Sequence, residues 1–213
     1  MINRDFVRVA VIDLSTRTFE IKDRPDLVPF LGGTGLAYHL FAEEVRWDRE
    51  ALAPEQPVIF ANGCLSSLYP GATRVTVVFR SPLNGYLGES YTGGSLGTAF
   101  FQAGYEALVI KGRSERPVYI TVGPRLIHIK KSDPLYGTGT EECWRYLFTL
   151  EPSPGIRSLV INGQAGERLV NFAGLNVDRY WHFGGAGAGT VFGSKNLKAL
   201  MVYGDRELPI PDP

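Results

Sequence analysis

Short runs of β-branched and aromatic residues, separated by polar turns, recur along the chain and predict a protein built mainly from strands. The first run, from Phe6 to Asp13, is followed by a polar turn and by residues 18–22, where apolar and polar positions alternate. This pair of runs indicates a hairpin. The same kind of pattern predicts further strands at 57–61, 75–79, 106–111, 118–122, 126–129, 158–161, 169–172 and 197–203.

Helical spacing of apolar residues is confined to a few segments. Leu36 and Leu40 follow the glycine turn at 32–35 and predict a helix over residues 35–45. A second helix is predicted over 141–150, with Thr140 as its N-cap. Because strands dominate and the few short helices do not alternate with them, the pattern favours a β-rich α+β fold over a doubly wound α/β fold.

Two parts of the chain echo each other. A glycine turn at 93–97 precedes the sequence ALVIKG at 107–112, and a glycine turn at 184–189 precedes ALMVYG at 199–204. The step from the second glycine of the turn to the alanine is 13 residues in the first case and 14 in the second. So short a match also arises by chance. A genuine repeat would give the fold two pseudo-symmetric halves, each with a glycine turn.

Glycine is the unusual component of the composition. The chain has 25 glycines among 213 residues, about 12% against roughly 7% in average proteins. They cluster at 32–35, 93–97 and 184–189. Free N–H groups at a glycine turn that opens a helix bind anions, so each cluster is a candidate anion site. None matches a dinucleotide or P-loop fingerprint, and tight turns or close packing explain any single cluster equally well.

Charge, hydropathy and cysteine content argue against several classes of protein. Lys plus Arg and Asp plus Glu both total 22, so no basic surplus indicates a nucleic-acid partner. No window approaches 18 uninterrupted apolar residues, which argues against a membrane span, and residues 1–14 make a poor signal peptide. Two cysteines provide no disulfide framework. We therefore expect a cytoplasmic protein.

Few side chains are candidates for chemistry. Arg74 lies just before a predicted strand and can clamp a phosphate through its guanidinium, although an exposed surface arginine explains it equally well. His182 is the histidine beside a glycine cluster, whereas His39 and His128 fit structural or exposed positions. Both cysteines fit buried apolar positions, and Glu141 fits helix-start charge. These residues indicate a backbone cradle for a phosphorylated cofactor, without a catalytic set of its own.

Six longer motifs follow one another along the chain: GGTGLA at 32–37, RSPLNGYLG at 80–88, TGG at 92–94, AGYEA at 103–107, GQAGE at 163–167 and GSKNLKA at 193–199. Together they resemble the N-terminal domain of tungsten-dependent aldehyde:ferredoxin oxidoreductases. The resemblance extends over residues 5–205. We therefore expect residues 1–205 to form one domain of that type and residues 206–213 to be a linker or tail.

The resemblance implies a base of two sheets related by a pseudo-twofold axis, on which a bis-pterin tungsten or molybdenum cofactor lies. The dithiolene sulfurs of the pterins hold the metal, so no protein ligand to it is expected. The backbone carbonyls at Tyr91 and His182 are implied ligands of a bridging magnesium ion. The implied cofactor-binding residues are Arg74, Tyr91, Thr92, Gly93, Gly94, Ser95, His182, Phe183, Gly184 and Gly185.

The chain departs from the family at three positions near the implied cofactor. The family commonly carries arginines near Trp181 and Gly185, and some relatives carry asparagine at the position of Tyr91. Charge-assisted hydrogen bonds to phosphate are strong, so replacing two arginines weakens the expected hold on the cofactor.

Enzymes of the family continue for several hundred residues beyond this domain. Their helical domains bring a 4Fe–4S cluster and the substrate pocket, and such a cluster usually needs four cysteines. We therefore expect those parts in missing C-terminal domains or a partner subunit, with an aldehyde oxidised to a carboxylic acid and ferredoxin accepting the electrons. The chain alone is expected to be inactive, and exposed apolar surface would favour a homo-oligomer. The alternatives are a stand-alone non-catalytic scaffold, a pterin-cofactor carrier, or a degenerate remnant that makes only protein contacts.

Overall fold

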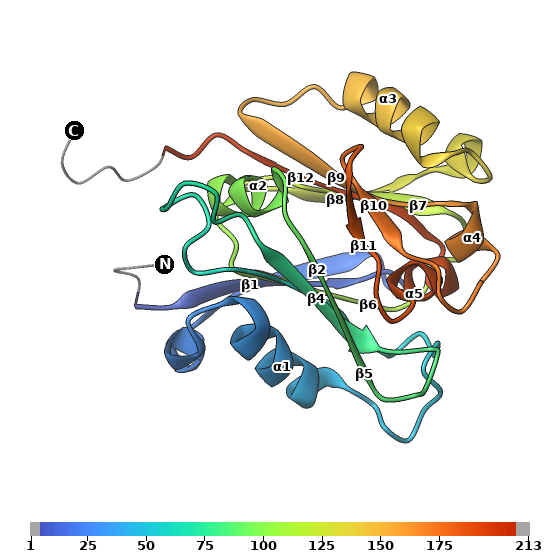
Figure 1. Ribbon diagram of the computed structural model, residues 1–213, viewed down its shortest axis with the longest axis horizontal. Helices are drawn as coiled ribbons and strands as arrows, with labels where there is room; N and C mark the ends of the chain where they lie inside the picture. The colour runs from blue at the N-terminus through green and yellow to red at the C-terminus, as the bar shows by residue number, and fades with distance from the viewer. Residues whose placement is uncertain (1–4, 208–213) are drawn as a thin grey trace.

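Two six-stranded mixed sheets form the centre of the computed structural model, which describes residues 5–207 (Figure 1). The first sheet contains β1 (Val7–Asp13), β2 (Thr18–Arg24), β3 (Val58–Asn62), β4 (Val75–Arg80), β5 (Leu87–Thr92) and β6 (Ala107–Lys111). The second contains β7 (Val118–Val122), β8 (Ile127–Lys131), β9 (Ile156–Asn162), β10 (Leu175–Val177), β11 (Trp181–Phe183) and β12 (Leu197–Gly204). Their strand orders are β2-β1-β6-β3-β4-β5 and β11-β10-β9-β12-β7-β8.

The two sheets have the same topology, which confirms the pseudo-symmetric halves. The hairpin β1–β2 joins β6 in parallel, as the hairpin β7–β8 joins β12. The antiparallel series β6–β3–β4–β5 is matched by β12–β9–β10–β11. The glycine-turn echo in the sequence therefore marks equivalent positions in two copies of one topology.

The helices also occur in equivalent places. η1 (Pro25–Phe30) and α1 (Gly33–Glu44) follow the first hairpin, and η2 (Asp133–Leu135) and α3 (Thr140–Leu150) follow the second. α2 (Leu96–Ala103) leads into β6, and α5 (Ala188–Ser194) leads into β12. A single turn of helix, α4 (Gln164–Glu167), lies only in the second half of the described chain.

The inner faces of the two sheets share one apolar core, and α1 and α3 cover the outer faces (Figure 1). The Phe60 ring from the first sheet lies 5.7 Å from the Phe183 ring and 5.9 Å from the Phe192 ring, measured between centroids. Leu36 and Leu40 of α1 pack on the first sheet, and Leu147 of α3 packs on the second. The shared core is therefore what joins the two halves.

Most of the predicted elements occur close to their expected positions. The predicted helix at 35–45 is α1, and the one at 141–150 is α3. Thr140 is not the N-cap of α3, because Gly139 occupies that position and no side chain caps the helix. Cys143, a residue of α3, is buried as expected, whereas Cys64 is only half-buried. No helix among residues 5–207 is long and apolar enough to cross a membrane.

The predicted strand at 169–172 is wrong. These residues form the turn after α4, where the N–H of Leu169 donates to the carbonyl of Gly166 and the φ of Leu169 is 57°. The short apolar run mimics a strand, but the helical turn before it has to be closed by a left-handed residue. The strands β10 and β11 went unpredicted because three residues are too few to show a period.

Lys195 joins the two halves from within the core. It follows α5, is 1% exposed, and its Nζ lies 2.9 Å from the carbonyl oxygen of Pro54 and 3.2 Å from that of Gly112. Both carbonyls belong to the first half of the fold. Burial lowers the pKa of Lys195 to about 7, although Asp13 and Glu55 act in the opposite direction.

The depressed pKa predicts a stability that rises with pH. Between pH 7 and about 10.4, the unfolded chain binds a proton at Lys195 that the folded chain does not, so raising the pH favours folding. We expect the free energy of unfolding of the wild type, minus that of Lys195→Met, to rise by up to about 1.4 kcal/mol per pH unit over this window. Urea titrations at several pH values measure it. Lys22→Met, which removes a half-exposed lysine, is the matched control.

Candidate functional site

Each of the two glycine segments that the sequence predicts as a cradle lies against the edge strand of the other half, because the edges of the two sheets meet there. In the described chain β5 and β11 are edge strands, and they contact each other. The N–H of Gly185 donates to Oγ of Ser90 over 3.1 Å, and a Cβ added at Gly185 would lie 3.1 Å from the carbonyl oxygen of Glu89. β5 ends just before Gly93, and β11 ends just before Gly184. Each glycine segment therefore follows one edge strand and lies against the edge strand of the other half.

Strand register defines which residues of the two halves correspond. Thr92 pairs with Val75, the first residue of β4, and Phe183 pairs with Leu175, the first residue of β10. Thr92 and Phe183 are therefore equivalent, and each precedes a pair of glycines. The other equivalent positions are Tyr91 and His182, Ser90 and Trp181, and Arg74 and Gly174.

The outer side of β5, beside the start of α1, brings Arg74 and Tyr91 together. The Arg74 guanidinium carbon lies 6.0 Å from the centroid of the Tyr91 ring, within the range of a cation–π contact. The Oγ1 of Thr34, in the first turn of α1, is 3.5 Å from the Tyr91 hydroxyl. Arg74 and Tyr91 are both exposed, so a cation is available at this end of β5.

A tyrosine–glutamate pair fixes β5 to α1 close to the cation. The Tyr38 hydroxyl donates to Oε2 of Glu89, which lies two residues before Tyr91 on the same strand. This hydrogen bond to a carboxylate raises the pKa of Tyr38 above its usual value. The phenol therefore stays protonated at neutral pH and serves as a donor that holds the strand.

The inner side of both strands faces the shared core. Phe183 is fully buried and Ser90 and Thr92 are nearly so, as strand alternation requires of residues that face the opposite sheet. The Thr92 hydroxyl is buried and has no hydrogen-bond partner within the described residues. An unpaired polar atom therefore lies directly beside Gly93.

The Trp181 indole lies across the first glycine segment. A Cβ added at Gly94 would lie 2.6 Å from Cδ1 and 2.9 Å from Nε1 of the indole. A Cβ added at Gly93 would lie 3.2 Å from Cζ3, at the benzene end of the ring. Trp181 is half exposed, so the indole covers the glycines from the solvent side. Alternation along β11 places it on the same side as Phe183.

Ser95 is used by the fold itself. Its hydroxyl donates to Oδ2 of Asp178 over 2.7 Å, and the same carboxylate accepts from the hydroxyl of Ser158 and the N–H of Leu159. Ser95 belongs to the first half and the other three residues to the second. The carboxylate therefore ties the cradle end of α2 to the second sheet.

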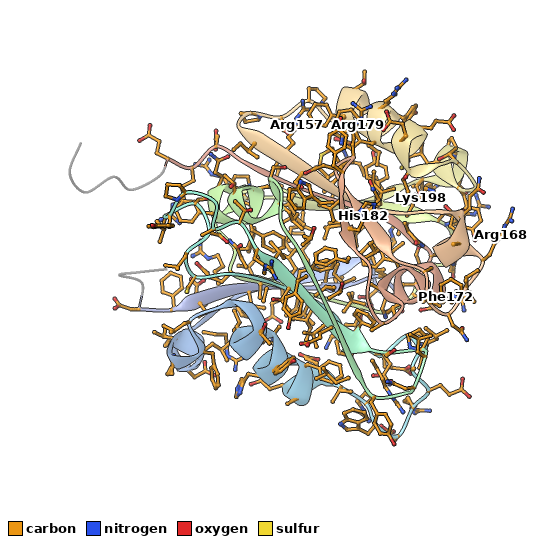
Figure 2. The ribbon with its side chains drawn as sticks, viewed as in Figure 1. Arg157, Arg168, Phe172, Arg179, His182 and Lys198 are labelled. Atoms are coloured by element: carbon orange, nitrogen blue, oxygen red, sulfur yellow. The ribbon has the colours of Figure 1, made fainter. Side chains whose placement is uncertain are left out.

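His182 and Gly184 are the exposed members of the second segment. The imidazole projects from β11 on the side opposite Trp181, with Nε2 3.4 Å from Nδ2 of Asn176 (Figure 2). Nothing lies within 4 Å of a Cβ added at Gly184, so its backbone is open. Figure 2 also places Arg168 and Phe172 away from His182, at the rim beside α4. Neither belongs to the cradle.

The structure places the predicted residues where the edges of the two sheets meet, and it adds two that the sequence did not indicate, Ser90 and Asp178. The sequence marks Trp181 only as a departure from the family, and the structure places its indole over Gly93-Gly94. No sequence signal marked their roles, because each acts across the boundary between the halves. The arrangement offers an open backbone at Gly184 and a cation at Arg74, which suit a ligand with phosphate groups.

Comparisons with known proteins agree with the sequence motifs. The model of the family described as "Aldehyde ferredoxin oxidoreductase, N-terminal domain" matches residues 9–204. The tungsten-containing aldehyde ferredoxin oxidoreductase of Pyrococcus furiosus is 35% identical over 210 residues, which are 97% of this chain and 34% of that protein. A WOR-like subunit of aliphatic sulfonate oxidoreductase from the same organism is 30% identical and matches 86% of this chain and 31% of its own length.

A solved structure has the same fold. A chain of the active-site complex BamBC of benzoyl coenzyme A reductase, determined with 1,5-dienoyl-CoA, superposes with a TM-score of 0.89 at 28% identity. The match extends over 94% of this chain and 31% of that chain. This chain therefore spans about a third of the length of the curated relatives it matches.

The Asp178 carboxylate is predicted to stabilise the junction below the cradle. Asp178→Ala removes the acceptor for Ser95, Ser158 and the Leu159 N–H, and we expect it to lower the free energy of unfolding by about 2–3 kcal/mol. Ser95→Ala removes one of these bonds and should cost about 1 kcal/mol. Urea unfolding followed by circular dichroism measures both. An Asp178→Ala protein within about 0.5 kcal/mol of wild type would contradict this role.

Proposed function

The chain belongs to the aldehyde ferredoxin oxidoreductase family, as its N-terminal domain, and from this premise we propose that it binds the redox cofactor of an oxidoreductase. The curated relatives are named as tungsten-containing enzymes. We propose that the ligand is a bis-pterin cofactor that carries tungsten or molybdenum, accompanied by a magnesium ion.

One observation carries this proposal: two equivalent edge strands meet at the junction of the two halves, and the two glycines after each strand lie against the strand of the other half. A cofactor that contains two pterins presents two similar halves of its own. A site built twice by the same topology offers each pterin one strand end and one glycine segment. The unpaired Thr92 hydroxyl and the open backbone at Gly184 are polar groups available to such a ligand.

Arg74 is the residue proposed to hold a phosphate by charge. It is exposed, and Tyr91 lies against its guanidinium, so it can turn towards a ligand on β5. The carbonyls of Tyr91 and His182 are the proposed magnesium ligands. Register makes these two residues equivalent, so their carbonyls suit a cation placed between the halves. Oxygen donors are what magnesium prefers.

In the full enzyme, the bound cofactor would supply a two-electron oxidation in which an aldehyde and water give a carboxylic acid, two electrons and two protons. This chain's residues bind and orient the cofactor. Among residues 5–207 no three His, Cys, Asp or Glu side chains are placed to hold a metal ion, and the sequence has two cysteines. We therefore propose that the 4Fe–4S cluster, the substrate pocket and the contact with ferredoxin belong to the other two-thirds of the full-length relatives' architecture.

Trp181 and Gly185 favour a second candidate, a non-catalytic scaffold or pterin carrier. The indole covers Gly93-Gly94, and a side chain at Gly185 would press on the carbonyl of Glu89. The indole reduces the backbone surface available to a phosphorylated ligand, and glycine at position 185 supplies no charge to bind one. A carrier requires weaker, reversible binding than an enzyme does. The retention of metal with the pterin distinguishes the two candidates, because an enzyme holds both through purification.

Cofactor content tests the proposed function. The chain is produced with tungstate and molybdate in an anaerobic host that makes the pterin, and metal and oxidised-pterin fluorescence are measured per chain. We expect metal near one equivalent and pterin near two. Pterin without metal would favour the carrier, and a complete lack of both would contradict cofactor binding by this chain.

Arg74→Ala is predicted to reduce the retained pterin about tenfold, because a charge-assisted bond to phosphate contributes about 1.5–3 kcal/mol. The matched control is Arg125→Ala, which removes an exposed arginine from the β7–β8 turn, at the opposite edge of the second sheet from β11. Equal pterin content in both variants would contradict the proposed binding of a phosphate by Arg74.

A further inference from the structure

The Trp181 indole can lie this close to the backbone of residues 93 and 94 only because both of these residues are glycines. The distances of 2.6 Å at Gly94 and 3.2 Å at Gly93 leave no space for a Cβ under the indole. The pyrrole end of the ring contacts one glycine and the benzene end contacts the next. The indole therefore extends along the backbone segment that the proposed function assigns to the cofactor.

The two halves differ at this position. Ser90, the equivalent of Trp181, accepts a hydrogen bond from the N–H of Gly185 and leaves Gly184 open. The small serine side chain thus pairs the N–H of Gly185 without covering the glycine segment to which Gly185 belongs. Trp181 instead covers its segment with an aromatic ring. Access to the two glycine segments is thus unequal in the described structure, although the backbone topology is the same.

The indole is placed where it can move. Trp181 is half exposed and is the first residue of a three-residue edge strand, whereas the buried Phe183 anchors the other end of that strand. Moving the indole away from Gly93-Gly94 exposes only one face of a side chain that already contacts solvent. A rotation about χ1 moves only the side chain and leaves the pairing of β11 with β10 in place.

We propose that Trp181 controls access to the Gly93-Gly94 backbone, and that a planar pterin-type ring reaches this backbone only when the indole leaves it. The inference rests on the proposed function for the identity of the ligand. The contact itself does not depend on a ligand, so the two can be tested separately. Trp181 is a residue that sets ligand affinity and is not a catalytic residue.

The first experiment tests the contact without ligand. The chain has three tryptophans, so Trp47→Phe and Trp144→Phe leave Trp181 as the only indole. In this background Gly94→Ala places a Cβ where the ring lies and should expel it. We expect a longer emission wavelength and about a twofold larger acrylamide quenching constant.

The matched control is Gly104→Ala. Gly104 has a φ of 83°, close to the 81° of Gly94, but nothing lies within 4 Å of its added Cβ. Both variants therefore place an alanine at a similar left-handed φ, and only Gly94→Ala puts a Cβ against the indole. Emission and quenching of Gly94→Ala that match those of Gly104→Ala would overturn the proposal. Circular dichroism shows whether each variant is folded.

The second experiment uses neopterin monophosphate as the probe and needs no glycine variant. Trp181→Ser gives the second half the residue that the first half has at this position, and Trp181→Phe keeps an aromatic cover. Equilibrium dialysis should show that Trp181→Ser binds the probe at least about threefold more tightly than wild type, with Trp181→Phe close to wild type. Probe binding should also shift the emission of the single-tryptophan chain to longer wavelength.

The outcomes separate this inference from the proposed function. Equal affinity of wild type and Trp181→Ser for the probe would overturn the control of access and leave pterin binding intact. No binding by any variant, Trp181→Ser included, would overturn both the control of access and the pterin cradle. Tighter binding by Trp181→Ser together with an expelled indole in Gly94→Ala supports both.

Discussion

The packing of two sheets on one shared core is the constraint from which the rest of the structure follows. Phe60 and Phe183 come from different halves and meet inside it, so neither sheet can bury its inner face alone. Closing the two sheets face to face brings the edge strands β5 and β11 together. The cradle is thus a product of core formation: each glycine segment reaches the strand of the other half because the two edge strands meet.

Close backbone approach explains much of the glycine content and several of the motifs that carry the resemblance. A Cβ at Gly193 would lie 1.9 Å from the carbonyl oxygen of Gly166, so GSKNLKA and GQAGE are shaped for contact between α5 and α4. The same two motifs supply Lys198 and Glu167, a buried ion pair at 2.5 Å. Removing one partner of such a pair leaves an uncompensated buried charge. These two motifs are therefore explained by packing within the second half as well as by ligand binding.

The sequence was most informative where a residue's role depends on its neighbours in the chain. Most strand runs, the helices α1 and α3 and the repeated glycine turn were predictable, whereas the strands β5, β10 and β11 were not, and family membership confirms the resemblance read from the motifs. The misassigned strand at 169–172 shows the limit, because the turn after α4 is set by hydrogen bonds to Gly166 and not by apolar pattern. The cover that Trp181 forms over Gly93-Gly94 and the hydrogen bond from Ser95 to Asp178 were beyond prediction, since each joins residues of different halves that are more than 80 positions apart.

The residues around the cradle are less symmetric than its backbone. Register makes Gly174 the counterpart of Arg74, and a Cβ at Gly174 would lie 2.8 Å from the carbonyl oxygen of Phe183, so the second half has no room for a matching arginine. The equivalent residues Trp181 and Ser90 also differ, because the indole covers a glycine segment and the serine does not. A ligand with two similar halves would therefore meet charge beside β5 and mainly backbone beside β11. Because a charge-assisted bond to phosphate contributes more than a neutral one, the half bearing Arg74 would provide most of the binding energy, and the open backbone at Gly184 would mainly orient the other pterin.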